Sequence, residues 1–401
     1  MITPFSIARL PRIEFGPGRI AQMPAIAARY GKRLLIVTGG RSFTATAQWE
    51  ALQRALDQAR FHYDIVRIAG EPSPDEVDAI VHDQRARAFD LVVGIGGGSV
   101  LDAAKAIAGL LKPGNTVMDH LEGVGPELPY RGPATPFIAV PTTAGTGSEA
   151  TKNAVLTRQG PDGFKKSFRD DTLVADYAIV DPDLLAGCPP DLIAANGMDA
   201  FTQLLEAYVS ARANPVTDAL ALAGLAAVRD GLFAWYRGGE DAAAGRARMA
   251  LAALLSGICL AQAGLGSVHG LAQPLGSLFP IPHGVVCGTL VAAATRVNCE
   301  AMQARAPGHP ALVKYALVGR LLGADPSADE AAARHYLLST LEEWTRRLNL
   351  PGLSALGVAE ADFARIVANS RGSSMKTNPV ELQDAEIERI LRLRFGDAAA
   401  A

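Results

Sequence analysis

Short apolar runs alternate with helix-like patterns through the first half of the chain. Four of these runs end in glycine or in a polar turn: residues 34–38, 91–95, 137–140 and 177–180. Such alternation predicts βαβ units, in which helices connect the strands of a mostly parallel sheet. In open α/β sheets, ligands bind at the carboxyl ends of the strands. The turns that follow the four runs are therefore the first places to look for a binding site.

The pattern changes after Pro182. Alanine, leucine and glycine dominate, and apolar residues recur at helical spacing, as at Phe201, Leu204, Leu205 and Tyr208. With 401 residues, the chain also exceeds the length at which one hydrophobic core usually stops growing. We therefore predict an α/β domain over residues 1–184 and a second domain, with helical patterning, over residues 185–401.

Composition narrows the classes of partner. A formal net charge of −3 argues against a nucleic acid or an anionic membrane surface and favours a small molecule. The first residues lack a basic segment followed by an apolar core, so we expect no signal peptide and a cytoplasmic protein. Residues 249–266 are the most apolar stretch, but they include Ser256 and Gln262, which favours a buried helix over a membrane span. The four cysteines lack CxxC spacing, and we interpret them as packing residues in a reducing compartment.

A glycine-rich turn at residues 94–105 reads GIGGGSVLDAAK. Without Cβ atoms, the backbone can approach a diphosphate closely, and the free N–H groups in the first turn of the following helix can bind it. The alternative is that these glycines only allow a tight connection between strand and helix. The run matches neither GxGxxG nor a P-loop.

A second turn, at residues 141–149, reads PTTAGTGSE and is unusually rich in hydroxyl groups. Thr142, Thr143 and Thr146 can bond a ribose, a phosphate or the amide of a nicotinamide. The alternative is that Ser148, with Glu149 nearby, caps the next helix. Capping does not account for the whole run.

The helical half contains residues suited to holding a metal. Asp199 and Gln203 stand four apart on one helix face, and His269 and Gln273 repeat this spacing. His283 follows in a Pro-His-Gly turn that can bring its imidazole back over a helix end. One carboxylate and two imidazoles can hold Zn²⁺ or Fe²⁺ and leave a position for a substrate oxygen. The alternative is that these are hydrogen-bonded structural histidines.

Taken together, the motifs resemble the iron-dependent (group III) alcohol dehydrogenase family, a relative of glycerol dehydrogenase and, more distantly, of dehydroquinate synthase. The resemblance rests on several runs in the same order: residues 15–18, 96–105, 141–149, 181–182, 197–200, 268–270, 281–284 and 377–379. It implies an N-terminal dinucleotide-binding α/β domain, a C-terminal all-helical domain, an active site in the cleft between them, and a dimer or larger homo-oligomer.

The resemblance also assigns residues. Its cofactor-binding positions fall on Gly97, Gly98, Ser99, Asp102, Thr142, Thr143, Thr146, Asn153 and Lys166. Three of the four metal ligands fall on Asp199, His269 and His283, which are therefore the catalytic residues we expect. The fourth ligand, normally histidine, is Gln203 in this chain, so we expect weaker iron binding, with Gln203 as a fourth ligand or a supporting partner. Glycerol dehydrogenase-like relatives hold zinc with one Asp and two His.

Two further positions bear on chemistry and cofactor. Gln273 stands where many members carry a histidine that helps to pass a proton, and neutral glutamine cannot act as that acid or base. After Thr38, where many NAD-using members have an aspartate, the chain reads Gly39-Gly40-Arg41-Ser42. Removing the acid and adding a cation and a hydroxyl suits a 2′-phosphate, so we expect NADP(H) rather than NAD(H).

We therefore expect reversible hydride transfer between a nicotinamide and a small alcohol or aldehyde, with a divalent metal polarising the substrate oxygen. One alternative is a maleylacetate-type oxo-acid reductase that needs no metal, in which Lys376 and Arg371 orient a carboxylate. Another is a nucleotide-binding relative that lost catalysis through Gln203 and Gln273. A lyase like dehydroquinate synthase is disfavoured, because its phosphate-binding lysines and arginines are not evident.

Overall fold

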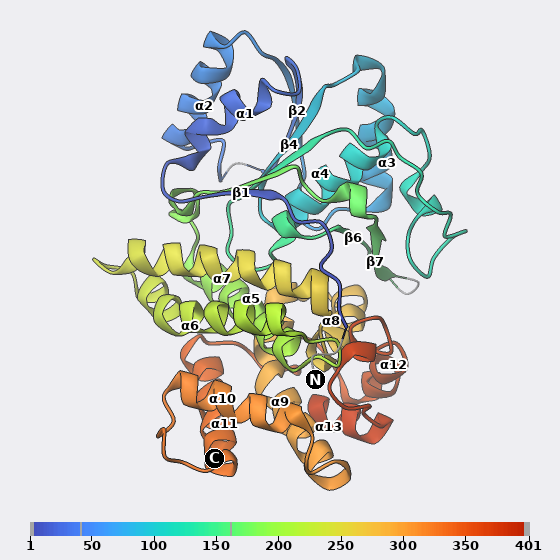
Figure 1. Cartoon of the computed structure of the whole chain (residues 1–401). Helices are drawn as coiled ribbons and strands as arrows, with labels where there is room; N and C mark the ends of the chain where they lie inside the picture. Colours follow the sequence, from blue (N-terminus) through green and yellow to red (C-terminus); the bar gives the residue numbers. More distant parts are fainter. Residues whose placement is uncertain (1–3, 41, 161–162, 397–401) are drawn as a thin grey trace. The chain divides into compact units, whose positions relative to one another are not determined.

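A computed structural model describes residues 4–40, 42–160 and 163–396 of the chain. The chain divides into two compact units, of which the first comprises most of residues 7–188 and the second mainly the residues from Pro189 onward. Figure 1 shows that the two units differ in architecture. Each is therefore described by itself.

The first unit is built on a six-stranded sheet in the order β1-β8-β5-β4-β2-β3, and every neighbouring pair is parallel. Its strands are β1 (Arg12–Phe15), β2 (Arg33–Thr38), β3 (His62–Arg67), β4 (Leu91–Gly96), β5 (Phe137–Pro141) and β8 (Tyr177–Val180). The predicted α/β fold with a mostly parallel sheet is confirmed. The four apolar runs correspond to β2, β4, β5 and β8.

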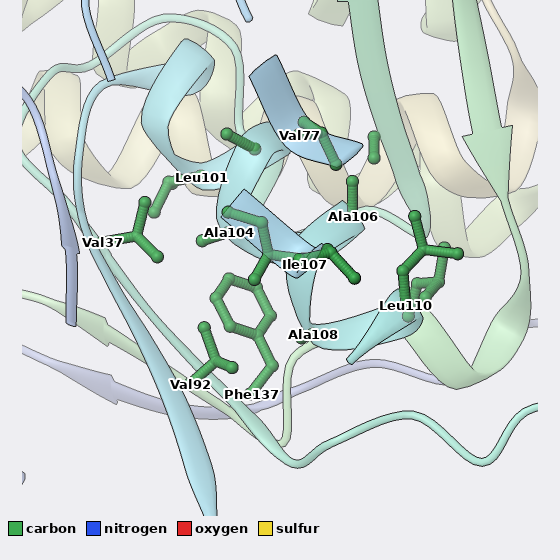
Figure 2. Packing of buried hydrophobic residues seen from close by; sticks show 14 of the residues in the cluster. Val37, Val77, Val92, Leu101, Ala104, Ala106, Ile107, Ala108, Leu110 and Phe137 are labelled. Atoms are coloured by element: carbon green, nitrogen blue, oxygen red, sulfur yellow. The ribbon is translucent and has the colours of Figure 1, made fainter. Parts of the chain in front are cut away.

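Helices cover both faces of this sheet: α1 (Met23–Ala27), α2 (Ala47–Gln58), α3 (Pro74–Gln84) and α4 (Gly98–Leu110). Successive side chains of β2 alternate between the faces, as the period of a strand requires. Leu34 and Ile36 pack in one core with α1 and α2, whereas Leu35 and Val37 pack in the other with α3 and α4. Figure 2 shows the second core, where Ile107 of α4 lies among side chains of the sheet and α3.

Local signals in the sequence explain where these helices begin. The Thr46 hydroxyl accepts a hydrogen bond from the N–H of Trp49 at the start of α2, and Ser73 does the same for Glu76 in α3. The N-cap of α4 is Gly97, which offers no side chain to cap the helix. The first turn of α4 therefore begins without the capping oxygen that α2 and α3 have.

A two-stranded antiparallel hairpin, β6 (Asn153–Arg158) with β7 (Phe164–Arg169), extends the first unit. Ala154, Leu156 and Phe168 of this hairpin are buried in the same core as α4. We did not predict this hairpin from the sequence. It carries Asn153 and Lys166, two of the expected cofactor-binding residues.

The second unit is helical, and its described residues contain no strand. Its helices are α5 (Pro190–Val209), α6 (Pro215–Arg237), α7 (Ala242–Ala263), α8 (Ser267–Leu278), α9 (His283–Arg305), α10 (Pro310–Leu322), α11 (Glu330–Arg347), α12 (Phe363–Ala368) and α13 (Asp384–Leu393). The predicted all-helical second half is confirmed. Helices α6 and α7 pack closely because both carry glycine at their contact: a Cβ on Gly231 would lie 2.9 Å from the carbonyl oxygen of Gly245.

Helix α7 is long and apolar enough to cross a membrane by length and composition alone. However, 61% of its apolar window is buried inside the structure. A Cβ added to Gly245 would lie 2.6 Å from the backbone nitrogen of Trp235 in α6, so this face of α7 is packed against protein. The helix has the burial of a core helix, as expected for residues 249–266.

Candidate functional site

Three helices of the second unit bring the predicted metal ligands together. Asp199 lies in the middle of α5, His269 in the first turn of α8, and His283 is the first residue of α9. The Oδ1 atom of Asp199 is 3.4 Å from Nε2 of His269 and 3.6 Å from Nε2 of His283. Asp199 and His269 are buried, and the His283 side chain is partly exposed. His269 and His283 follow Asp199 by 70 and 84 positions in the chain, and the fold brings the three side chains together.

Glu206 fixes the orientation of His269. It lies seven residues after Asp199 on α5, and its carboxylate accepts a hydrogen bond from Nδ1 of His269 at 2.6 Å. A proton held on Nδ1 leaves Nε2 with its lone pair facing Asp199, which is the tautomer that binds a metal. The same carboxylate accepts the backbone N–H of Val268 at 2.7 Å, so it also caps α8. Sequence reasoning missed Glu206, although its spacing of two helical turns from Asp199 was a usable signal.

The turn around Asn378 supports the start of α8 from the other side. Oδ1 of Asn378 accepts the backbone N–H of Ser267 at 3.1 Å, and its Nδ2 donates to Oδ1 of Asn298 at 2.8 Å. Gly266 is needed at this junction, because a Cβ there would lie 2.8 Å from Oδ1 of Asn378 and 2.9 Å from Oε1 of Glu206. This explains structurally why the Thr-Asn-Pro run accompanies the histidine motif.

Gln203 lies beside Asp199 but does not direct its oxygen toward the histidines. Its Nε2 donates to Oδ1 of Asp199 at 3.4 Å, and its Oε1 accepts the hydroxyl of Ser256 at 2.9 Å. In this arrangement, Gln203 supports the carboxylate of Asp199. Of the two roles expected for Gln203, the geometry matches that of a supporting partner.

Cys287 completes the cluster. It lies one helical turn after His283 on α9, is fully buried, and its Sγ is 3.6 Å from Nε2 of both His269 and His283. Burial raises the pKa of the Cys287 thiol to about 12, although His269 opposes this effect. The sequence predicts a packing role for all four cysteines, and the contacts of Cys287 with two histidines add to that prediction. The spacing from His283 was the sequence signal that could have singled out Cys287.

The donor set fits a divalent cation. One atom each from Asp199, His269, His283 and Cys287 lies within 4.8 Å of the other three. The Oδ2 atom of Asp199 is buried and has no hydrogen-bond partner among the described residues. Burial alone raises the pKa of Asp199, but His283 and His269 outweigh it and hold that pKa below its usual value. The cluster therefore favours a carboxylate that a cation can neutralise.

The predicted cofactor loops lie at one edge of the sheet in the first unit. Strands β5, β4 and β2 are neighbours, and Thr142, Gly97 and Gly39 directly follow their carboxyl ends. Gly40 and Ser42 are exposed in the loop after β2, whereas Arg41 lies outside the described residues. The structure thus brings the three predicted loops to the sheet edge where α/β proteins bind ligands.

Two of these loops interlock. A Cβ on Gly98 would lie 2.6 Å from Cγ2 and 2.7 Å from Oγ1 of Thr146, and one on Gly97 would lie 3.3 Å from Thr143. The glycines are therefore needed for packing between loops, whether or not a phosphate also approaches them. Ser99 follows in the first turn of α4 and is partly exposed.

A buried lysine of α4 connects the glycine-rich run to the threonine-rich turn. The Nζ of Lys105 donates to the carbonyl oxygens of Ser148 and Asn153 at 2.9 and 2.6 Å, and lies 3.6 Å from Oδ1 of Asp102. Ser148 in turn donates its hydroxyl to Asp102. Burial raises the pKa of neighbouring Glu149 to about 7, in spite of Lys105. Sequence reasoning did not foresee that Asp102 and Lys105 form this support.

The hairpin separates two predicted cofactor residues. Opposite residues of an antiparallel pair share a face, and successive residues alternate. Asn153 is therefore on the same face as Thr157 and its partner Lys165, whereas Lys166 pairs with Leu156 on the other face. Lys165 forms an ion pair with Glu71 at 2.6 Å. Asn153 and Lys166 are thus not brought together.

Comparisons with known proteins agree with this arrangement. The family model "Iron-containing alcohol dehydrogenase" matches residues 11–182, and "Fe-containing alcohol dehydrogenase family, C-terminal" matches residues 193–395. The chain belongs to the iron-containing alcohol dehydrogenase family. Alcohol dehydrogenase 4 of Saccharomyces cerevisiae is 34% identical over 91% of both chains. The NAD-dependent methanol dehydrogenase of Bacillus methanolicus is 29% identical over 95% of this chain and 97% of its own.

A solved structure, that of a 1,3-propanediol oxidoreductase, superposes with a TM-score of 0.89 at 28% identity and covers 98% of this chain and 100% of its own. As an iron-containing alcohol dehydrogenase, the protein is an oxidoreductase that links alcohol chemistry to a nicotinamide cofactor with the help of a metal. The oxo-acid reductase alternative is not favoured. Arg371, one of its two candidate cations, is held by the carbonyl oxygen of Leu382 and by Asp384.

Proposed function

We propose that the protein interconverts a small alcohol and its aldehyde by hydride transfer to and from NADP(H), with a divalent cation held by Asp199, His269 and His283. One observation carries this proposal above the others: the two histidine Nε2 atoms predicted from scattered motifs lie 3.4 and 3.6 Å from the same carboxylate oxygen of Asp199, within one unit. When bound, the cation supplies Lewis acidity toward the oxygen of the alcohol or aldehyde.

The chain's own residues then have separate tasks. Glu206 keeps the proton of His269 on Nδ1, so that Nε2 stays available as a donor. Gln203 holds Oδ1 of Asp199 from the side. Gln273 lies one helical turn after His269 and has no acidic or basic group, so the alcohol proton must leave through water, a ribose hydroxyl or another residue.

The preference for NADP(H) rests on the loop after β2. Gly39 and Gly40 follow Thr38 where an acid would repel a 2′-phosphate, and Ser42 is exposed in the same loop. We propose that Arg41 supplies the positive charge for that phosphate. Comparing kcat/KM for NADPH and NADH tests this preference, and a tenfold preference for NADH would overturn it.

The activity itself is tested with a panel of aldehydes, each assayed with NADPH and NADH and with added Zn²⁺ or Fe²⁺. Turnover that depends on the metal supports the proposal. Full activity in rigorously metal-free protein would remove the Lewis-acid role. Cofactor binding without any turnover would instead favour a nucleotide-binding relative that has lost catalysis.

We further propose a cytoplasmic enzyme that assembles as a dimer or larger homo-oligomer. The oligomer is what the family resemblance implies, and a small alcohol as substrate fits the names of the family model and the relative. Sedimentation equilibrium on the purified protein checks the assembly, and a purely monomeric mass would contradict it.

A further inference from the structure

We propose that Cys287 is a fourth protein ligand of the metal, giving an Asp-His-His-Cys donor set that selects Zn²⁺ over Fe²⁺. The inference rests on the metal site of the proposed function and names a ligand which that function does not require. The family's fourth ligand is a histidine, and this chain has Gln203 at that position. The question of a fourth ligand therefore arises from this chain's own residues.

The spacing of the four side chains carries the argument. In a tetrahedral zinc site with bonds of about 2.0–2.1 Å to nitrogen or oxygen and about 2.3 Å to sulfur, neighbouring donors lie about 3.3–3.6 Å apart. The distances from Asp199 Oδ1 to the two histidine Nε2 atoms are 3.4 and 3.6 Å. Both distances from Cys287 Sγ to these nitrogens are 3.6 Å. Four edges of the donor set thus have the lengths of a zinc tetrahedron.

Gln203 does not direct its amide oxygen toward the histidines in this structure. Its amide oxygen is engaged by the hydroxyl of Ser256, and the amide nitrogen, which cannot act as a ligand, faces Asp199. Cys287 approaches the two imidazoles from α9, where it lies one turn after His283. The sulfur would therefore supply the fourth donor atom in a chain where Gln203 replaces the family's histidine.

A second observation points to a cation at the same place. Oδ2 of Asp199 is buried without a hydrogen-bond partner among the described residues, although Asp199 is only 1% exposed. Buried polar atoms are rarely left in this state unless an ion or a water binds them. The carboxylate and the sulfur thus belong to one donor set.

The chemistry of sulfur decides which metal is preferred. On binding, the S–H bond breaks, its proton leaves to solvent, and a bond from sulfur to the cation forms without any change in oxidation state. Thiolate is a soft ligand that favours zinc, whereas carboxylate and amide oxygens do not discriminate in this way. Four protein donors still admit a substrate, because zinc sites expand to five donors during catalysis.

X-ray absorption at the zinc edge of the loaded wild-type enzyme is the first test, and it needs no variant. We expect a sulfur scatterer at about 2.3 Å together with nitrogen and oxygen at about 2.0–2.1 Å. A first shell of nitrogen and oxygen alone would overturn the Cys287 ligand and leave the proposed function standing. If the protein binds no zinc, cobalt or iron at all, both proposals fail.

Cobalt substitution with matched variants is the second test. Wild type loaded with Co²⁺ should show a near-ultraviolet charge-transfer band from thiolate to cobalt. Cys287→Ser and Cys287→Ala should lose this band. Cys299→Ser is the control, because Cys299 is a buried cysteine on the same helix that lies outside the donor cluster. A band that persists in both Cys287 variants would refute the assignment.

Competition between zinc and iron completes the design. Wild type and Cys299→Ser, offered equal anaerobic Zn²⁺ and Fe²⁺, should retain mainly zinc. Cys287→Ser should shift the bound ratio severalfold toward iron, as measured by elemental analysis. An unchanged ratio in Cys287→Ser would show that the sulfur does not select the metal.

Discussion

At the scale of single residues, two buried carboxylates illustrate how position decides what the same chemical group does. Glu206 accepts hydrogen bonds from the first turn of α8 and from His269. Each of its two carboxylate oxygens therefore has a hydrogen-bond donor. Glu149 lies buried beside Lys105, and its pKa is raised by burial. The carboxylate of Glu206 orients a residue of the metal site. That of Glu149 lowers the free energy of unfolding when it is ionised, by an amount that depends on pH.

Glu206→Gln should weaken zinc binding by about 10- to 100-fold, the usual effect of losing a hydrogen-bonded partner of a metal-binding histidine. The amide no longer provides the charge that keeps the Nδ1 proton in place. Competition with a fluorescent chelator measures the affinity. Glu342→Gln, which removes an exposed ion pair with Arg296, is the matched control and should bind zinc like wild type. Equal affinity in all three proteins would mean that His269 is held without Glu206.

Glu149→Gln should flatten the pH dependence of stability. The pKa of Glu149 is about 7 in the folded state and its ordinary value is 4.5, so the folded state holds an extra proton between these two pH values. Stability from this group is complete below the lower value and is lost as pH rises toward the upper one. From pH 5 to 8, wild type should lose about 2–3 kcal/mol relative to the variant, at 1.36 kcal/mol for each pKa unit. Urea unfolding at several pH values measures this loss. Parallel curves for the two proteins would contradict it.

At the scale of elements, loops and helix starts form the sites. The glycine turn before α4 and the threonine turn after β5 touch through Gly98 and Thr146. Lys105 of α4 also supports the threonine turn, because its Nζ donates to the backbone carbonyl of Ser148 and to that of Asn153 in β6. The two cofactor loops therefore behave as one structural element.

Gly98→Ala should destabilise the protein by about 1–3 kcal/mol, the typical cost of overpacking. The added methyl group would lie 2.6 Å from Thr146. Thr146→Ala should recover part of this loss in the double variant, since residues in contact are not additive. Gly187→Ala, which meets nothing within 4 Å, is the control. Denaturant unfolding is measured for wild type, the two single variants, the double variant and the control, and strict additivity would argue against the contact.

The sequence predicted elements better than it predicted individual contacts. Strands β2, β4, β5 and β8 were found because each is apolar along its whole length, as strands buried on both faces are. The β6–β7 hairpin was missed because only a few of its residues, such as Leu156 and Phe168, face the core. Asp199, His269 and His283 were found from motifs. The contacts of Cys287 with the two histidines could not be predicted, because a cysteine on an apolar helix is typical of packing until its neighbours are known.

At the scale of the whole molecule, the two predicted sites belong to different units. All four donors of the metal cluster come from α5, α8 and α9, and the cofactor loops come from the α/β unit. Metal binding should therefore act directly on the helical unit. The cation would neutralise a carboxylate that is otherwise buried with an unpartnered oxygen.

Removing the metal should lower stability. A ligand present at about 100 times its Kd stabilises the folded state by about 2.7 kcal/mol. We expect the midpoint of thermal unfolding to fall after chelation and to return when Zn²⁺ is added. Asp199→Asn should show little response to zinc. A midpoint in wild type that is indifferent to zinc would mean that the cluster does not hold it.

The contact between Gly98 and Thr146 also constrains how these two positions can evolve. Because a side chain at position 98 needs the space that Thr146 fills, the two positions are not free to change separately. Among diverging relatives, a larger residue at the first position should occur only with a smaller one at the second. The glycine would then be retained partly because Thr146 leaves no room for a side chain at position 98. Its presence alone would be poor evidence that a given relative still binds a nucleotide.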